Sequence, residues 1–209
     1  MTHDICACVS IPLRAKGAQS NDAAWPVRSG NCAAGRGVAC FGVTGAAHLR
    51  RGKEGVTLNL PIVPCSSVEQ PGWLDMREAL WPEATREEHV AEMAAFLGDP
   101  RRYVNYIAYT EAGEPAGFAE ASLRRDHVSG ARTSPVGYLE GLFVAPQHRR
   151  RGVGRALVRA VEGWAAAQGC TELASDTGSD NLESQATHLA LGFSEIERAV
   201  AFLKALPRG

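Results

Sequence analysis

Residues 138–155 contain the stretch that decides the fold, Tyr138-Leu139-Glu140-Gly141-Leu142-Phe143-Val144-Ala145-Pro146-Gln147-His148-Arg149-Arg150-Arg151-Gly152-Val153-Gly154-Arg155. Its first part predicts a β-strand, because aromatic, aliphatic and β-branched side chains occur from Tyr138 to Val144 and Pro146 ends the run. Its last part predicts a helix, because apolar residues recur at three- and four-residue spacing from Val153 to Trp164. A strand, a short turn and a helix therefore follow one another.

The turn between this strand and this helix has the composition of an anion-binding site. Its residues are Arg149, Arg150, Arg151, Gly152, Val153, Gly154 and Arg155. The two glycines allow a tight turn that points several backbone N–H groups one way, at the positive end of the helix dipole. The consecutive arginines add permanent positive charge. We predict a cradle for a pyrophosphate; the alternative is a basic surface turn.

Two other phosphate-binding loops are excluded by their spacing. The sequence has no Gly-x-x-x-x-Gly-Lys-Ser/Thr run, which a P-loop requires. It also has no Gly-x-Gly-x-x-Gly directly after a strand near the start of a β-α-β unit, which a dinucleotide-binding fold requires. The cradle is therefore of another kind.

The overall composition is that of a globular protein with one domain. The chain has 209 residues and a formal net charge of −1, with an excess of basic residues in 1–58 and of acidic residues in 59–209. An acidic body with one basic cluster argues against a nucleic-acid partner and favours a cationic substrate beside an anionic cofactor. No apolar run approaches the ~20 residues that span a bilayer. No secretory signal is evident, so we expect no membrane partner and a cytoplasmic location.

The cysteines do not predict a metal site. Their gaps fit no common zinc-binding spacing, and no His-x₃₋₅-His pair follows them. We expect free thiols and no metal at the six positions Cys6, Cys8, Cys32, Cys40, Cys65 and Cys170.

The chain divides near residue 57. Residues 1–57 show no useful helical or strand periodicity, so we expect a disordered or loosely packed N-terminal extension. Residues 58–209 form the predicted domain, of mixed α/β class with a largely antiparallel sheet. We predict strands at 56–65, 102–110, 115–124, 136–144, 172–175 and 193–206, and helices at 68–81, 85–98, from Val153 onward, and 181–191.

The strand ending in Leu-Phe-Val-x-Pro and the following Arg-x-x-Gly-x-Gly resemble the acetyl-coenzyme A site of the GNAT superfamily of N-acetyltransferases. The body resembles, more narrowly, the aminoglycoside 6′-N-acetyltransferases over about residues 60–206. The matching stretches are Leu80-Trp81-Pro82, Gly117–Arg124, Ser134-Pro135, Tyr138–Val144, Ala174-Ser175-Asp176 and His188-x-x-Leu191-Gly192-Phe193-x-Glu195-x-Glu197-Arg198.

The resemblance implies a GNAT fold, with a central, mostly antiparallel twisted sheet flanked by helices. It implies transfer of an acetyl group from acetyl-CoA to the 6′-amine of an aminoglycoside, which confers antibiotic resistance. Relatives commonly form dimers, so it also implies a homodimer. We expect direct transfer in a ternary complex, because no cysteine lies near the motif to form an acetyl-enzyme.

The resemblance also assigns cofactor-binding residues. In this superfamily the backbone N–H groups at the end of the motif strand hold the pantetheine arm and the thioester carbonyl, as an added strand would. The corresponding residues here are Leu142, Phe143 and Val144. The turn from Arg149 to Arg155 takes the pyrophosphate, and Asn181 is a candidate contact of the pantetheine arm.

Two carboxylates are the main catalytic candidates. An amine must lose a proton before it attacks a thioester, and carboxylates facing one pocket would hold a polycation and relay that proton. Glu140 matches the family's amine-binding acid and Asp176 its second substrate acid. The alternatives are that Glu140 pairs with an arginine and that Asp176 caps a loop.

Four further residues complete the candidate site. His188 stands where many GNAT enzymes keep a tyrosine that protonates the departing thiolate, but it could also simply line the cofactor. His127 replaces a substrate-binding tyrosine of the relatives, or is a surface residue. Trp81 and Tyr138 are expected to contact the substrate, although Trp81, like Trp73, could instead belong to the core.

Two other functions remain open at this point. The domain could acetylate another small amine, such as a polyamine or a peptide N-terminus, because an acidic body suits any polycation. It could also be a sensor that binds CoA without catalysis, although the presence of both candidate acids argues against this. Acetyl-CoA turnover distinguishes these functions.

Overall fold

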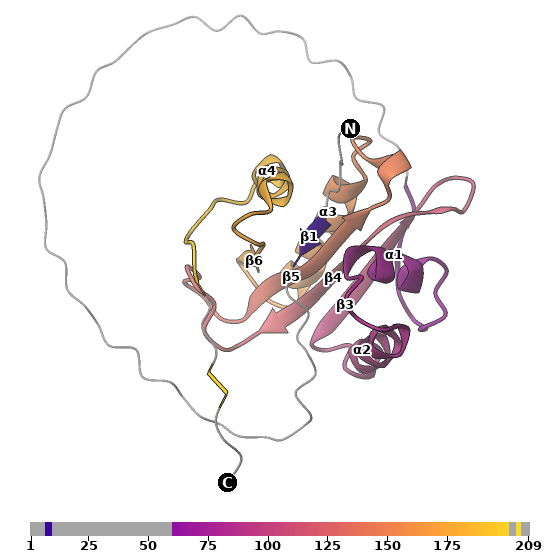
Figure 1. Cartoon of the computed structure of the whole chain (residues 1–209). Coiled ribbons are helices and arrows are strands. Elements are labelled where there is room, and N and C mark those ends of the chain that lie inside the picture. The colour runs from indigo at the N-terminus through magenta and orange to yellow at the C-terminus, as the bar shows by residue number, and fades with distance from the viewer. Residues whose placement is uncertain (1–6, 10–59, 201–203, 206–209) are drawn as a thin grey trace, which may run out of the picture. The chain divides into compact units, whose positions relative to one another are not determined.

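The computed structural model describes residues 7–9, 60–200 and 204–205 (Figure 1). The elements of this part of the chain are β1 (Ala7–Val9), β2 (Ile62–Pro64), α1 (Trp73–Leu80), α2 (Arg86–Gly98), β3 (Tyr103–Tyr109), β4 (Pro115–Arg124), β5 (Val136–Val144), a 3₁₀ turn (Pro146–His148), α3 (Val153–Ala167), β6 (Leu173–Ser175) and α4 (Leu182–Leu191).

The strands form one sheet in the order β1-β5-β4-β3-β2, and β6 pairs with β5 outside this path. Only the β5–β6 pair is parallel; the other pairs between described strands are antiparallel. Such a parallel pair needs a crossover, which α3 supplies. The expected mixed, mostly antiparallel sheet is confirmed.

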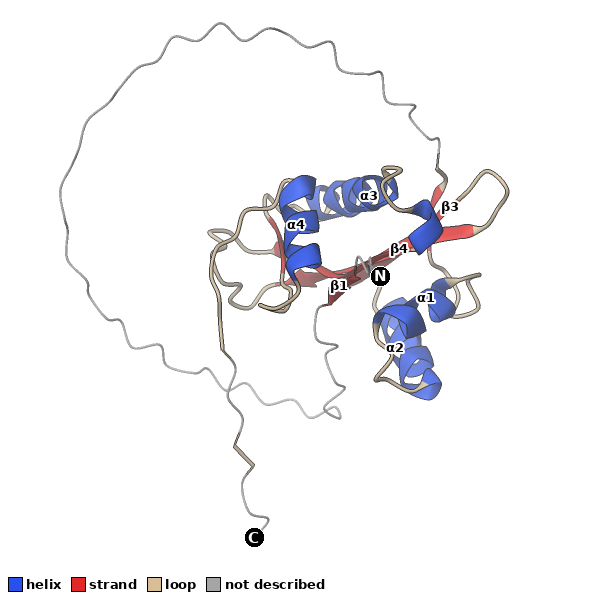
Figure 2. Ribbon diagram, turned by 45° about the horizontal axis from the view of Figure 1, so that its top comes forward, coloured by secondary structure: helices blue, strands red, loops and turns tan. Residues whose placement is uncertain are grey.

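Helices cover both faces of the sheet (Figure 2). On one face, the apolar stripe of α3, which includes Leu157 and Val161, packs against Leu139, Leu142 and Val144 of β5. On the other face, α1 packs against β4 and β5, and α2 packs against β3. They do so through a second cluster, whose members include Trp73, Met76, Leu80, Trp81, Met93, Ile107, Phe118 and Phe143. Burial of these apolar surfaces is the main stabilising term for the domain.

A network of charged side chains is buried between α1, α2 and β4. Arg77 Nη1 donates to both carboxylate oxygens of Glu120, at 2.6 and 2.5 Å, and Nη2 donates to Glu92 at 2.5 Å. Trp73 Nε1 also donates to Glu120, at 2.7 Å. The side chains of Arg77 and Glu120 are 1% and 3% exposed, so their charges can be accommodated only as a pair.

Strand β5 contains a β-bulge at Glu140. Gly141 pairs with Glu120 of β4, and Leu139 pairs with the next residue, Ala121, so Glu140 has no partner in the ladder. The extra residue shifts the alternation of β5 side chains between the two faces of the sheet by one residue. Leu139 before the bulge and Leu142 after it therefore face the same helix, α3, although their spacing of three would place them on opposite faces of a regular strand.

Local sequence signals explain several helix ends. Thr85 and Glu88 form the predicted capping box at the start of α2. Gly192, with φ of 102°, ends α4 as expected. The helix expected over 68–81 begins only at Trp73, because Gly72 before it has φ of 81°, outside the helical range.

The two ends of the domain differ from expectation. The strand expected over 193–206 is absent from its described residues, 193–200 and 204–205, because no neighbouring strand pairs with them. Conversely, Ala7–Val9, within the expected extension, forms β1 against β5. The other residues of 1–57 lie outside the described part, as do 56–59 of the first expected strand, so the boundary at 57 stays a prediction. No helix in the described ranges is long and apolar enough to cross a membrane.

Candidate active site

The predicted anion cradle lies at the start of α3. Gly152, with φ of 86°, is the N-cap residue, and the helix begins at Val153. The first N–H groups of a helix have no partner within it, so they are available to an anion. Arg150 adopts φ of 59°, the one described residue other than glycine with positive φ. The turn therefore adopts the tight conformation that its glycines predicted.

The arginines of the cradle have different environments. Arg149 Nε donates to the carbonyl oxygen of Val144 at 3.1 Å, while its buried Nη1 has no hydrogen-bond partner among the described residues. A buried guanidinium nitrogen without a partner is costly, and an anionic ligand would satisfy it. Arg150 and Arg151 are exposed. Arg155 Nη2 donates to the carbonyl of Ala190 at 2.9 Å and so connects α3 with the end of α4.

The outer edge of β5 divides into two parts. Residues Gly137–Leu139 pair with β6, and Gly141–Phe143 pair with β1. The side chains of Leu142, Phe143 and Val144 are buried in the two cores. The backbone edge predicted to hold a pantetheine arm is thus the edge on which the structure places β1.

Glu140 is held by two residues of β4. Its Oε1 accepts from Ser122 Oγ at 2.5 Å and from Arg124 Nε and Nη2 at 3.3 and 3.0 Å. Its Oε2 accepts from Arg124 Nη2 at 2.9 Å. The carboxylate is therefore paired with an arginine, which was the alternative weighed from the sequence, but with Arg124 rather than an arginine of the cradle.

Asp176 follows β6 and accepts a hydrogen bond from Tyr138 Oη, at 2.7 Å to Oδ1. Burial, followed by this hydrogen bond and the negative charge of Asp176, raises the pKa of Tyr138 above its usual range. The tyrosine therefore remains a hydrogen-bond donor at neutral pH. The Arg124 guanidinium lies over its ring, 3.2 Å from the centroid. Glu140 and Asp176 are thus connected through Arg124 and Tyr138.

His188 lies on α4, beside the parallel pair of strands. Its Nε2 is 2.9 Å from Ser175 Oγ, and its Nδ1 is 2.8 Å from the carbonyl oxygen of Ser184. Ser175 Oγ in turn donates to the carbonyl of Leu139 at 3.0 Å. Asn181, the other candidate on this element, caps α4 by accepting from Ser184 N at 3.0 Å. His188 therefore connects α4 with β6, and Asn181 caps the same helix.

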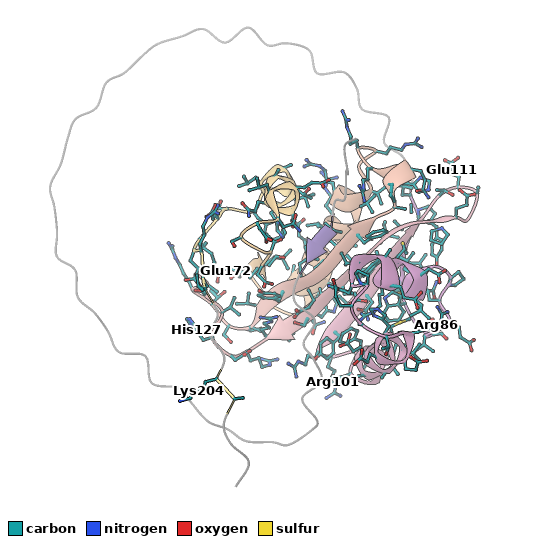
Figure 3. All side chains as sticks on the ribbon, viewed as in Figure 1. Arg86, Arg101, Glu111, His127, Glu172 and Lys204 are labelled. Atoms are coloured by element: carbon teal, nitrogen blue, oxygen red, sulfur yellow. The ribbon has the colours of Figure 1, made fainter. Side chains whose placement is uncertain are left out.

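The remaining two candidates lie apart from this network. Trp81 is 4% exposed and makes an edge-on contact with Phe118 in the core, and Trp73 is fully buried. This burial favours the core alternative for both tryptophans, and a substrate contact by Trp81 stays a prediction. His127 is exposed on the loop between β4 and β5 (Figure 3). The loop surrounds a hollow of about 280 Å³ lined by Arg125, Asp126, His127, Val128, Ala131, Arg132, Thr133 and Ser134.

The comparisons with known proteins identify the family. The acetyltransferase (GNAT) family profile matches residues 73–193. The chain belongs to the GNAT family. This GNAT chain is 45% identical to an aminoglycoside N(6′)-acetyltransferase type 1 of Serratia marcescens over 145 residues, which are 69% of this chain and 99% of that protein. It is 43% identical to the enzyme of the same name from Acinetobacter baumannii, over 68% of this chain and 97% of the relative.

Solved structures agree with this family. A structure of AAC(6′)-Iy in complex with the bisubstrate analogue CoA-S-monomethyl-acetylneamine matches with a TM-score of 0.66 and 39% identity, covering 70% of this chain and 99% of the other. AAC(6′)-Ih from Acinetobacter baumannii matches with a TM-score of 0.67 and 41% identity, covering 71% and 99%. The resemblance drawn from the sequence and the expected GNAT fold are both confirmed.

Two site residues were not predicted from the sequence, Ser122 and Arg124. Both lie on the face of β4 that carries Glu120, since residues two apart in a strand share a face. They belong to the stretch Gly117–Arg124 that carried the resemblance, but their contacts with Glu140 depend on the bulge. Among the described residues, no group of three or more His, Cys, Asp or Glu side chains is arranged to hold a metal.

Proposed function

We propose that this GNAT protein transfers the acetyl group of acetyl-CoA to the 6′-amino group of aminoglycosides, by direct attack in a ternary complex, and so confers resistance. One observation carries the proposal: Glu140, on the strand that leads into the anion cradle, is connected with Asp176 through Arg124 and Tyr138. Relatives that share this body bear the name of that activity.

The cradle residues fit the anionic part of acetyl-CoA. Arg149 Nη1 is buried and lacks a partner within the described residues, and the N–H groups at the start of α3 point out of the helix. Together they would hold the pyrophosphate, with exposed Arg150 and Arg151 adding attraction. Bound acetyl-CoA supplies the thioester acyl group. Its pantetheine arm would take the β5 edge at Leu142–Val144, which β1 must then leave.

Glu140 would bind the 6′-ammonium group and accept its proton, directly or through water. Asp176 is exposed and would bind another ammonium group of the polycation, while Tyr138 holds its Oδ1 in place. Two carboxylates in one region favour a polycationic substrate. For His188, beside Ser175 at the end of β6, we propose protonation of the departing thiolate. His127 would contact the aminoglycoside from the loop.

We also propose a homodimer and a cytoplasmic location. Leu182 and Leu189 of α4 and Ile196 and Val200 beyond it are 70%, 60%, 60% and 78% exposed. The segment after α4 mixes these apolar side chains with charged ones, and it has no strand partner among the described residues. A second copy would cover this surface and supply a pairing edge. Sedimentation at several protein concentrations tests the dimer.

The activity is tested by thiol release from acetyl-CoA. Purified protein is supplied with kanamycin A, or with an analogue that carries a 6′-hydroxyl in place of the amine. Turnover with the amine alone would support both the reaction and its position. Turnover with neither, combined with acetyl-CoA binding, would reject aminoglycosides in favour of another amine; spermidine and a short peptide are then the next acceptors.

The role of Glu140 is tested by substitution. Because general-base catalysis contributes about 10²–10⁴-fold, Glu140→Gln should lower kcat by roughly this factor. Glu111→Gln, which removes an equal charge from the exposed β3–β4 turn (Figure 3), is the control and should leave kcat unchanged. Equal kcat values for the two variants would exclude Glu140 as the base.

A further inference from the structure

Arg124 occupies the centre of the candidate site, although no role was predicted for it. It ends β4, and its guanidinium makes an edge-on pair with Glu140 and a face-on contact with Tyr138. The side chains of Arg124 and Glu140 are 27% and 16% exposed, so the pair is accessible to a ligand. The planar guanidinium of an arginine fixes the geometry of a carboxylate bound to it, which suits a role in positioning.

The contacts make the two oxygens of Glu140 unequal. Oε1 receives Ser122 Oγ, Arg124 Nε and Arg124 Nη2, whereas Oε2 receives Arg124 Nη2. Oε1 therefore has its acceptor capacity filled, and Oε2 has a lone pair left for a further donor. The planar fork of Arg124 also prevents rotation of the carboxylate, because rotation would break two bonds at once.

The same guanidinium supports the second acid. Its carbon lies 3.2 Å from the centroid of the Tyr138 ring, and the hydroxyl of that ring donates to Asp176 at 2.7 Å. A cation over an aromatic face is attracted by the ring quadrupole, which restricts both partners. One side chain thereby constrains the orientation of both carboxylates that the proposed reaction uses.

We propose that Arg124 is the positioning residue of the acetyl transfer: it presents Oε2 of Glu140 to the substrate amine and steadies Tyr138 against Asp176. This inference rests on the proposed function. Arg124 also neutralises Glu140 before substrate binds, so an arriving ammonium group competes with an internal cation. The arginine therefore favours correct placement of the amine over tight binding.

The test compares Arg124→Gln and Arg124→Lys with Arg125→Gln. The control removes the same charge from the neighbouring residue, which is exposed and does not contact Glu140. Displacement of a reacting group by about 1 Å costs on the order of 100-fold in rate, so kcat should fall by about that factor in both Arg124 variants. Lysine should not rescue it, because an ammonium group lacks the planar fork.

The Michaelis constant and chemical rescue separate positioning from a general structural effect. Without Arg124 the site gains negative charge, so the KM for kanamycin A should stay equal or fall while kcat drops. A damaged fold would raise KM. In Arg124→Ala, added methylguanidinium should restore part of kcat, whereas methylammonium at the same concentration should not.

The outcomes are distinct from those for the proposed function. If wild type turns over kanamycin A and Arg124→Gln keeps its kcat, or Arg124→Lys is fully active, the positioning role is wrong and the acetyl transfer stands. If wild type turns over no aminoglycoside, a crystal structure of Arg124→Gln decides the inference. We expect the Glu140 carboxylate to be rotated in that structure, compared with its orientation in wild type. An unmoved carboxylate would overturn it.

Discussion

Replacing Arg77 by methionine should leave Glu120 as an unpaired, buried charge. The substitution removes the two hydrogen bonds that Arg77 Nη1 donates to that carboxylate, at 2.6 and 2.5 Å, and leaves only Trp73 Nε1 at 2.7 Å among the described partners. It also removes the partner of Glu92. Methionine fills much of the volume of the arginine side chain, so the effect comes mainly from charge and hydrogen bonding rather than from a cavity.

The expected loss in the free energy of unfolding is large. Breaking a buried ion pair by removing one partner costs about 3–5 kcal/mol, because the remaining charge stays desolvated. For a chain of this size, each kcal/mol corresponds to roughly 2–4 °C, so the melting temperature should fall by roughly 6–20 °C. Adding Glu120→Gln removes the orphaned charge and should recover about 1–3 kcal/mol.

Urea unfolding followed by tryptophan fluorescence measures this loss, since Trp73 and Trp81 contact the network directly. The matched control is Arg86→Met, which breaks an ion pair with Glu78 on the surface, where the two side chains are 59% and 34% exposed (Figure 3). That variant should lose less than about 1 kcal/mol. If both single variants lose the same amount, the reasoning about burial is refuted.

Four further predictions concern the site and its surroundings. Arg149→Met should raise the KM for acetyl-CoA by about 10- to 100-fold, the cost of a charged hydrogen bond, without changing the KM for aminoglycoside; an unchanged acetyl-CoA KM would contradict the cradle. Gly141→Ala should cost about 1–3 kcal/mol in urea unfolding, because its Cβ would lie 2.6 Å from Trp81 Cη2, and full stability would contradict this. The pKa of Tyr138 is raised in the folded state, so the contribution of this tyrosine to stability should decline as the pH rises above 10.0, the ordinary pKa of tyrosine. The difference in stability between wild type and Tyr138→Phe should therefore shrink above this pH, and a constant difference would count against the reasoning. A chain that starts at Leu60 lacks β1 and should show a lower KM for acetyl-CoA; an equal KM would mean that β1 does not compete.

Much of this fold could be predicted because local and long-range preferences agree. The capping box at Thr85, the hairpin before Pro115 and the turn at Gly152 combine a short-range signal with an apolar pattern that suits the same structure. The four candidate residues Glu140, Asp176, Tyr138 and His188 were found from their positions in the family stretches.

The contacts between these residues were beyond sequence reasoning. Regular alternation of side chains along the strands does not predict that Arg124 lies beside Glu140, because the bulge removes Glu140 from the register of β5 with β4. Gly141 was the available signal, since a glycine within a strand often marks a bulge or a close approach. Here it marks both: the bulge precedes it and Trp81 lies against it. The buried pair of Arg77 and Glu120 was equally hidden, because each residue alone is typical of a surface.

The bulge also separates the pairing of the sheet from the placement of Glu140. With Glu140 deleted, Leu139 would be followed by Gly141, and the alternation of β5 would become regular while Leu139 and Leu142 both still faced α3. The ladder with β4 would keep every present pair. The backbone pairing of β5 with β4 therefore does not depend on Glu140, whose contacts with β4 are made by its side chain alone.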